Sequence, residues 1–417
     1  MMTSYPHGDP SWFVQDRFGM FIHWGTYAQG ARHEWLKKRE KMTTEEYLKY
    51  FKTFDPDLYD PREWAALAKE AGMKYFVITT KHHEGFCLWD TAYTDYKAPN
   101  TPAGRDLLKP MVEAFREAGL KVGFYYSLID WHHPEFPVDR IHPQAEDQAF
   151  REANKHRDVR KYADYMYNQV EELLTKFGKI DIMWFDFSYP GEDGKGHEDW
   201  QSERLIELIR RLQPHILLNN RLDLKNAHDF VTPEQVQPRE PMRDEEGNLV
   251  VWEACQTFSG SWGYYRDEQT WKSVDLLLRM LIDSVAKGGN MLLNVGPTGR
   301  GEFDYRARER LRGMGEWMRT NGRSIYHCGP APETFPQPTD CRYTYNPKTN
   351  RLYVHLFAWP FKHLHLPQMA GKVWYAQFLH DASEVLFREN EDDGYLTLQL
   401  PVVQPKITIP TIELFLK

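Results

Sequence analysis

The 417-residue sequence predicts an α/β fold: a (β/α)8-like barrel of the TIM type, followed by a small antiparallel β-sandwich. Two observations predict the barrel. Eight short apolar runs precede residue 300, and stretches of helical periodicity separate most of these runs. A third observation predicts the sandwich. Beyond Asn321-Gly322, short runs follow one another with Asn, Gly, Pro and Asp between them and no helical pattern. We therefore expect a barrel over residues 1–325 and a β-sandwich over residues 326–417.

The apolar runs define the predicted barrel strands, and several of these runs end in polar or turn residues. In chain order they are residues 17–25, 75–80, 121–126, 180–187, 216–221, 229–232, 250–255 and 291–295. The run at 180–187 is apolar almost throughout, which is typical of a parallel strand covered on both faces. Residues 233–249 are rich in Pro, Arg and Glu instead of helical in pattern, so we expect the barrel to be irregular or open there.

Helical patterns separate most of these strands. Asp60-Pro61-Arg62-Glu63 combines an N-cap, a proline at the first helical position and a capping-box glutamate. Apolar residues at helical spacing then predict helices near residues 60–71, 108–118, 170–177, 205–212, 274–281 and 305–318. In the last part of the chain, the predicted strands are 351–357, 372–378, 383–387, 395–400 and 411–416.

Composition excludes several classes of function. The net charge is -8 and no run of Lys or Arg is longer than three residues, so neither nucleic acid nor an anionic membrane surface is expected as a partner. No apolar run approaches the roughly 18 residues of a membrane-spanning helix. The four cysteines lack Cys-x-x-Cys spacing and are expected to be reduced. The first residues lack the features of a secretory signal, and we expect a cytoplasmic protein.

Polar residues gather where the predicted strands end, and the strand ends of a parallel barrel meet on one face. They are His23, Trp24, His82, His83, Tyr126, Asp130, Trp184, Asp186, Arg221, Glu234 and Glu253. Aromatic residues form 14% of the chain, and flat aromatic faces commonly bind sugar rings. Paired carboxylates among aromatic faces and hydrogen-bonding histidines are what glycoside hydrolysis requires.

Other chemistries have little support in the sequence. Histidines and carboxylates are also zinc ligands, but the first strand carries Ile22-His23-Trp24 and no His-x-His pair. The chain has no Gly-x-x-x-x-Gly-Lys loop, no dinucleotide fingerprint and no Gly-x-Ser-x-Gly elbow. We therefore expect no metal and no cofactor.

Five blocks of sequence together resemble the α-L-fucosidases of glycoside hydrolase family 29, over about residues 10–300. They are Phe21-Ile22-His23-Trp24-Gly25, Thr80-Lys81-His82-His83-Glu84-Gly85-Phe86, Gly123-Phe124-Tyr125-Tyr126-Ser127, Trp184-Phe185-Asp186 and Asn290-Met291-Leu292-Leu293-Asn294-Val295-Gly296-Pro297. The resemblance implies a barrel with a C-terminal β-sandwich. It also implies retaining hydrolysis of terminal α-L-fucose through a covalent intermediate, without metal or cofactor.

The resemblance also implies roles for individual residues. Asp186 corresponds to the nucleophile, and Asp229 to Glu234 resembles the segment that supplies the acid/base in several bacterial members, with Glu253 as the second candidate. The residues matching the family's sugar contacts are His23, Glu34, Trp35, His82, His83, Tyr126, Trp184 and Arg221, and Trp262 is expected to line the sugar's methyl group. Phe187 departs from the family pattern, since many relatives carry glycine or another small residue there.

The expected partners are fucosylated glycans or small fucosides. Two alternatives stay open at this point: a barrel glycosidase of another sugar, such as an α-galactoside, and a fucose-binding protein without catalysis. The linkage preference, the aglycone and the formation of a homo-oligomer are also left open by the sequence.

Overall fold

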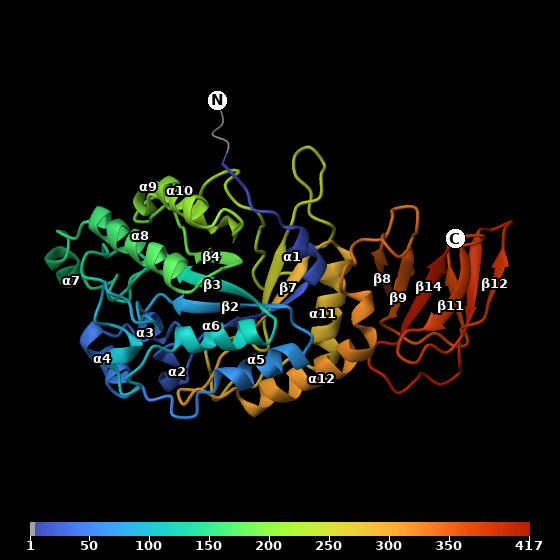
Figure 1. The fold of residues 1–417 in the computed structure, drawn as a ribbon, viewed down its shortest axis with the longest axis horizontal. Helices are drawn as coiled ribbons and strands as arrows, with labels where there is room; N and C mark the ends of the chain where they lie inside the picture. The colour runs from blue at the N-terminus through green and yellow to red at the C-terminus, as the bar shows by residue number, and fades with distance from the viewer. Residues whose placement is uncertain (1–4) are drawn as a thin grey trace.

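The computed structural model describes residues 5–417, which form a parallel-sheet part followed by a smaller antiparallel part at its side (Figure 1). The parallel sheet has seven strands in the order β5-β4-β3-β2-β1-β7-β6. Their bounds are β1 Phe18–Ile22, β2 Tyr75–Lys81, β3 Lys121–Ser127, β4 Ile182–Asp186, β5 Leu217–Leu218, β6 Glu253–Thr257 and β7 Asn290–Val295. The sheet is an irregular, TIM-like half-barrel, as the sequence predicts.

The irregular side lies between β5 and β6, which do not pair with each other. Residues 229–235 run between them and make isolated parallel bridges, Asn219 to Phe230, Val231 to Trp252 and Glu234 to Cys255. The predicted strand at 229–232 is therefore a bridged segment and no regular strand. Pro233 contributes to this, because it has no N–H for a ladder.

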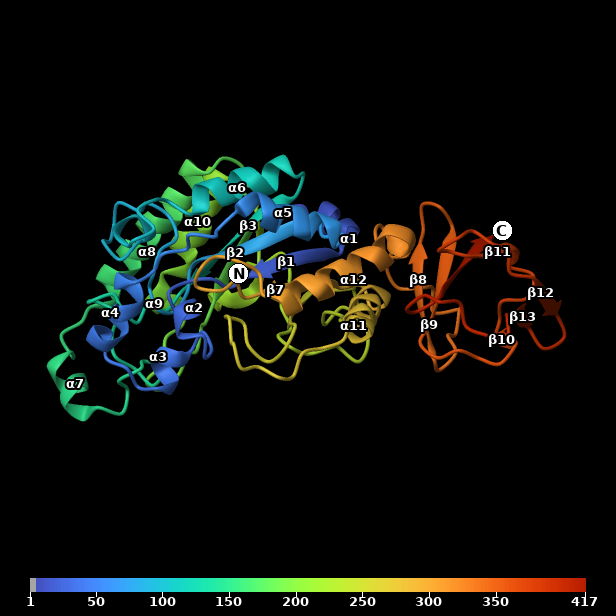
Figure 2. The same ribbon diagram turned by 90° about the horizontal axis from the view of Figure 1, so that it is seen from below.

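Helices cover the outer face of the sheet (Figure 2). The longer ones are α5 Pro61–Glu70, α6 Leu108–Glu117, α8 Val159–Lys176, α10 Ser202–Leu212, α11 Val274–Ala286 and α12 Tyr305–Asn321. Shorter ones are α1 Ser11–Asp16, α2 Tyr27–Gly30, α3 Leu36–Arg39, α4 Thr44–Lys52, α7 Gln148–Ala153 and α9 His197–Trp200, with 3-10 turns η1 Ala98–Asn100, η2 Asn220–Leu222 and η3 Gly322–Ser324. The predicted cap of α5 is confirmed, since the Asp60 carboxylate accepts the N–H groups of Arg62 and Glu63.

Alternate residues of the strands belong to two different cores. The inner set includes Phe21, Tyr125, Ile182, Trp184 and Leu292 and fills the interior of the half-barrel. The outer set packs between the sheet and the helices. This period of two decides which side chains can reach the carboxyl-end face of the sheet.

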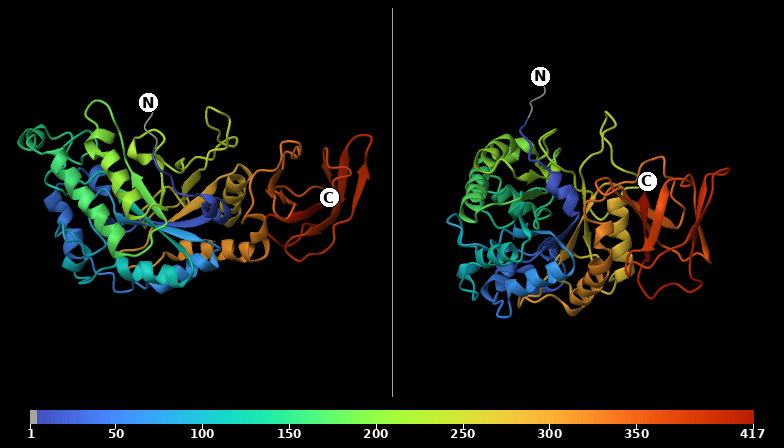
Figure 3. Two further views of the ribbon diagram at one scale, coloured as in Figure 1. Left: turned by 45° about the horizontal axis from the view of Figure 1, so that its top comes forward. Right: turned by 45° about the vertical axis from the view of Figure 1, so that its right-hand side comes forward.

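The antiparallel part contains two sheets, ordered β11-β14-β9-β8 and β10-β13-β12, which lie beyond α11 and α12 (Figure 3). Its strands are β8 Cys341–Asn346, β9 Arg351–Leu356, β10 His363–Leu366, β11 Val373–Phe378, β12 Phe387–Asn390, β13 Tyr395–Gln399 and β14 Thr411–Leu416. The sequence prediction missed β8 and β10, and it placed a strand at 383–387 where β12 only begins. The domain boundary at 325/326 stays a prediction.

Within residues 5–417, none of the helices combines the length and the apolar character needed to cross a membrane.

Candidate active site

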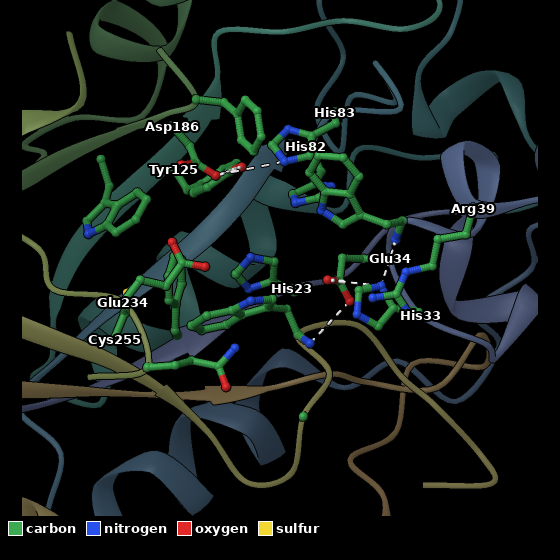
Figure 4. A pocket seen from close by; sticks show the side chains of 17 residues that line it. His23, His33, Glu34, Arg39, His82, His83, Tyr125, Asp186, Glu234 and Cys255 are labelled. Carbon is green, nitrogen blue, oxygen red and sulfur yellow. Dashed lines mark hydrogen bonds and ion pairs between the residues drawn. The ribbon is translucent and has the colours of Figure 1, made fainter. Parts of the chain in front are cut away.

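A cavity of about 360 Å³ opens at the carboxyl ends of the parallel strands (Figure 4). It brings together nine of the residues predicted from the sequence: His23, Glu34, Trp35, His82, His83, Trp184, Asp186, Glu234 and Trp262. The other residues that line it are Phe21, His33, Arg39, Tyr125, Phe187, Gln235, Cys255 and Gly260.

Asp186 is the last residue of β4, and its side chain is 13% exposed at the cavity. One carboxylate oxygen accepts a hydrogen bond of 2.8 Å from the Tyr125 hydroxyl and lies 3.9 Å from Nε2 of His83. The other oxygen accepts a bond of 3.0 Å from Arg221. Burial raises the pKa of Asp186 to about 6, with Arg221 acting against the rise and Glu234 adding to it.

Arg221, from η2, joins the two carboxylates of the site. Its Nη1 donates to Asp186, and its Nη2 donates to Glu234 at 3.1 Å. The guanidinium is itself fixed, because it donates to the hydroxyl and the carbonyl of Thr232 and lies over the Trp184 ring, 5.0 Å from the centroid. Asp186 and Glu234 are thus bonded to the two terminal nitrogens of one guanidinium, which we call the Arg221 fork. The Glu234 side chain is 44% exposed and is open to the cavity mouth.

Glu253 occupies a different place from Glu234. It is the first residue of β6 and pairs with the first residue of β7, at the end of the sheet opposite to Asp186. It is completely buried, it does not line the cavity, and it accepts a hydrogen bond of 2.5 Å from the Tyr75 hydroxyl. Burial raises the pKa of Glu253 to about 8, so a neutral carboxyl in the interior is its natural state near neutral pH.

Hydrogen bonds behind the site orient the imidazoles of His23 and His83. The amide nitrogen of Asn294 donates to the Trp262 carbonyl at 2.6 Å, so its oxygen accepts from Nδ1 of His23, also at 2.6 Å. The Ser127 hydroxyl donates to the Ile129 carbonyl and therefore accepts from Nδ1 of His83 at 2.7 Å. In both rings Nε2 is left as a hydrogen-bond acceptor.

Three of the four histidines that line the cavity, His23, His82 and His83, are fully buried and neutral near pH 7. Burial lowers the pKa of His23 to about 3 and places those of His82 and His83 well below their usual range. His82 and His83 follow directly after β2, where the pairing with β3 shifts register. Gly85 permits the turn after them, since its φ is +85° and a Cβ there would lie 2.3 Å from a carboxylate oxygen of Asp130.

Glu34 fixes the loop that carries Trp262. One of its oxygens accepts from the backbone N–H of Trp262 at 3.1 Å and of Gly263 at 2.8 Å, and from the Ser261 hydroxyl at 3.2 Å. Its other oxygen lies 3.2 Å from Nδ1 of His33. Burial raises the pKa of Glu34 to about 7. This carboxylate therefore shapes the cavity wall as well as lining it.

The prediction of Tyr126 as a cavity residue is wrong, and its neighbour Tyr125 takes that place. Tyr125 points into the half-barrel and donates to Asp186, whereas Tyr126 points outward and donates to Gln169 at 2.7 Å. The alternation along β3 is the physical reason. The sequence shows that Tyr125 and Ser127 lie on one face of the strand and Tyr126 on the other. Both faces are apolar, however, so the sequence does not show which of them is the inner face.

Several cavity residues were not predicted. Phe187 was noted only as a departure, yet it lines the cavity and has φ of +81°, a left-handed conformation that costs a bulky residue about 1–3 kcal/mol. His33 and Arg39 come from the long connection after β1, where no periodic pattern indicates which side chains point inward. Arg221 was predicted as a sugar contact and lies behind Asp186 and Glu234, without lining the cavity itself.

Among residues 5–417, no group of three or more His, Cys, Asp or Glu side chains has the arrangement of a metal site.

Comparison with known proteins gives consistent results. A family model described as Alpha-L-fucosidase matches residues 4–323. The solved structure of alpha-L-fucosidase isoenzyme 1 from Paenibacillus thiaminolyticus is 46% identical, with a TM-score of 0.93 and coverage of 98% of each chain. Plasma alpha-L-fucosidase of Homo sapiens is 29% identical over 385 residues, which are 84% of this chain and 76% of that protein.

A further solved structure concerns the reaction. It is an alpha-L-fucosidase of family GH29 from Bacteroides thetaiotaomicron, 28% identical, with a TM-score of 0.85 and coverage of 100% of this chain and 98% of that chain. That protein was trapped as a covalent intermediate with 2-fluoro-fucosyl fluoride in a glutamate-to-glutamine mutant. The family match includes every strand of the parallel sheet described here.

Proposed function

Since this chain belongs to the α-L-fucosidase family, glycoside hydrolase family 29, we propose that Asp186 is the nucleophile and Glu234 the acid/base of its reaction. The protein is an α-L-fucosidase that works with retention of configuration, as the sequence predicts. The observation that supports both assignments is the Arg221 fork, which holds the two carboxylates at one cavity. Glu253, buried at the opposite end of the sheet, has no path to a sugar in that cavity.

In the first step, an oxygen of Asp186 attacks the anomeric carbon while the bond from that carbon to the leaving oxygen breaks. Glu234 donates its proton to the leaving oxygen, so the aglycone departs as an alcohol. Tyr125 and Arg221 position the attacking carboxylate, because each donates to one of its oxygens. Phe187, Trp35 and the buried histidines limit the access of water, which strengthens these contacts.

In the second step, water attacks the same carbon from the side that the aglycone left. Glu234, now ionised, takes a proton from this water, and the bond to Asp186 breaks. Two inversions give net retention, and both carboxylates return to their starting states.

Neutral imidazoles hold the sugar in this proposal. Nε2 of His23 and of His83 accept hydrogen bonds from fucose hydroxyls, since the Nδ1–H of each ring is already donated to Asn294 or Ser127. Phe21 and Trp262 supply the apolar wall for the methyl group of the 6-deoxy sugar. Terminal α-L-fucosyl residues of glycans or small fucosides are therefore the substrates we propose.

A pair of aryl glycosides tests the proposed specificity. The enzyme should cleave 4-nitrophenyl α-L-fucoside with a kcat/KM about 10- to 100-fold above that for 4-nitrophenyl α-L-galactoside, which adds one hydroxyl at C6, because this hydroxyl would lose a water hydrogen bond against the apolar wall. Release of nitrophenol is the readout. Comparable rates with the two substrates would favour the alternative of a barrel glycosidase for another sugar.

Two adjacent tyrosines give a matched pair of variants. Tyr125→Phe removes the hydrogen bond to the Asp186 carboxylate and should lower kcat/KM by about 10- to 100-fold, the value of a hydrogen bond to a charged group. Tyr126→Phe removes a buried bond to Gln169 instead and should lower the free energy of unfolding by about 1 kcal/mol while leaving kcat/KM close to wild type. If Tyr126→Phe lowers kcat/KM and Tyr125→Phe does not, Tyr126 is the residue of the active site.

The pH dependence should report on Asp186. The carboxylate must be ionised to attack, and its pKa is raised to about 6, so kcat/KM should fall as the pH drops through about 6. Arg221→Met removes a cation that lowers this pKa, and the fall should begin about one to two pH units higher. Arg239→Met, at a residue 96% exposed, is the control and should leave the profile in place. If the acid limb of the Arg221→Met profile lies at the same pH as in the wild-type enzyme, the role given to the Asp186–Arg221 pair is wrong.

A further inference from the structure

Glu84 is a buried carboxylate next to the active site, and neither step of the reaction uses it. It follows His82 and His83 in the turn after β2, it is 1% exposed, and it does not line the cavity. Burial raises the pKa of Glu84 to about 7, and hydrogen bonds from Thr26 and Tyr47 act against the rise. A carboxylate removed from water needs such donors, so their origin shows which elements Glu84 joins.

The donors come from two other parts of the chain. Oε1 of Glu84 accepts the backbone N–H of Thr26 at 3.1 Å, and Oε2 accepts the Thr26 hydroxyl at 2.5 Å and the Tyr47 hydroxyl of α4. A Cβ at Gly25 would collide with Oε1 of Glu84, so the close approach of the two loops requires glycine there. Glu84 therefore ties the turn after β2 to the loop after β1, which begins at His23.

His82 has weaker support than the other two fully buried histidines of the cavity. His23 and His83 each donate Nδ1–H to a neighbouring side chain, whereas Nδ1 of His82 is buried and has no hydrogen-bond partner in the described part of the chain. The rings packed against His82 are those of His23, His83, Tyr125 and Tyr27. Tyr27, at a centroid distance of 5.4 Å, does not line the cavity and so supports His82 from behind.

Glu84 acts on both supports of His82, which are the backbone of its turn and the Tyr27 ring. It lies two residues after His82 in the same turn, and it fixes Thr26, the residue directly before Tyr27. Without the carboxylate, both hydrogen bonds to Thr26 are lost, and the contact between the Tyr27 and His82 rings loosens.

Asp130 supports the other side of the turn independently. It is paired with Lys81, the last residue of β2, at 3.2 Å, and the backbone N–H of the residue after Asp130 donates to the His83 carbonyl at 2.8 Å. His83 therefore keeps its place when Glu84 is changed. The effect of Glu84 is expected at His82.

We propose that Glu84 is a positioning residue, which holds His82 at the sugar through Thr26 and Tyr27. The inference rests on the proposed function, since it takes His82 as one of the neutral imidazoles that hold fucose. The contacts of a well-placed imidazole strengthen in the transition state, so displacement of the ring lowers kcat/KM. Glu84 itself touches no substrate and acts only through His82.

A double-mutant cycle in kcat/KM for 4-nitrophenyl α-L-fucoside tests this coupling. Glu84→Ala should lower kcat/KM about tenfold, and His82→Ala should lower it at least as much. The variant with both changes should lie within about twofold of His82→Ala, because no ring is left for Glu84 to position. Two losses that multiply would overturn the proposal, since Glu84 would then act elsewhere.

Two further variants separate position from stability. Glu84→Gln keeps the shape and hydrogen-bonding capacity of the side chain, so kcat/KM should return to within about threefold of wild type. A Glu84→Gln enzyme as impaired as Glu84→Ala would contradict the positioning role. Glu172→Ala is the matched control, because Glu172 is also buried and accepts from the Trp89 indole at 2.8 Å and from a backbone N–H at 3.0 Å, away from the cavity. It should lower thermal stability and leave kcat/KM within about twofold of wild type.

Thr26→Val covers the case in which Glu84→Ala does not fold, as judged by circular dichroism and thermal unfolding. It removes the hydroxyl bond to Glu84 and keeps the shape of the side chain. Here kcat/KM should fall about three- to tenfold in the wild-type background and less than about twofold in His82→Ala. Losses that multiply overturn the proposal here too. Wild-type kcat/KM in a folded His82→Ala variant would instead contradict the sugar contact taken from the proposed function, so the two failures are distinct.

Discussion

Asp186→Gly should lower the turnover of an aryl α-L-fucoside by several orders of magnitude, because the variant has lost the group that forms the covalent intermediate. The fold should persist, since the side chain lies at the open end of β4 and makes its contacts in the cavity. Nitrophenol release under saturating substrate measures the effect, and circular dichroism checks the fold. Near-wild-type turnover in a folded variant would remove Asp186 from the role of nucleophile.

The same strand offers a matched control. Asp181 precedes β4 at its amino end and accepts the backbone N–H of Val122 at 3.0 Å. Asp181→Gly should therefore reduce stability and leave the chemistry intact. Added azide gives a second readout for Asp186→Gly, since the anion can displace the aglycone directly from the face that the carboxylate occupied. One inversion then yields β-L-fucosyl azide, which proton NMR distinguishes from the α anomer.

Glu234→Ala should abolish the cleavage of unactivated fucosyl disaccharides, because a sugar leaves poorly without protonation. The first step on an aryl fucoside with a good leaving group should be spared. The hydrolysis of the fucosyl-enzyme should be slow, because it lacks the base, so this intermediate should accumulate. Azide should accelerate that step by attacking from the aglycone side. After two inversions the product is α-L-fucosyl azide, opposite in configuration to the product of Asp186→Gly.

Glu253→Ala is the comparison that separates the two glutamates. It removes a buried carboxyl bonded to Tyr75, so we expect a loss of stability of about 1–3 kcal/mol and no azide response. If azide accelerates Glu253→Ala and has no effect on Glu234→Ala, the roles are reversed.

Much of the fold could be predicted because local chemistry decides it. The Asp60 cap, the apolar stripes of the helices and the apolar runs of the strands are properties of short segments. β5 is the instructive exception: a six-residue run at 216–221 forms only two residues of strand, since the chain turns into η2 there and places Arg221 beneath the two carboxylates. That turn depends on the bridged segment 229–235, which is distant in sequence.

The site divides in the same way. Asp186 could be located because a carboxylate directly after a buried parallel strand lies on the carboxyl-end face. The choice between Tyr125 and Tyr126 could not be made, because both faces of β3 are apolar and a shift of one residue exchanges them. His33 and Arg39 come from a connection without periodicity, and only packing places them at the cavity.

The sequence by itself determined the parallel architecture, the antiparallel C-terminal sheets, the family and the positions of Asp186 and Glu234 along the chain. Only the tertiary structure decided that Arg221 joins these two carboxylates, that Glu253 is buried at the far end of the sheet, and that Phe187 lines the cavity. The reason is physical: strand and helix formation follow from the chemistry of adjacent residues. Contacts between side chains that are 35 or 13 residues apart, such as those of Arg221, exist only once the whole sheet has brought its strand ends together.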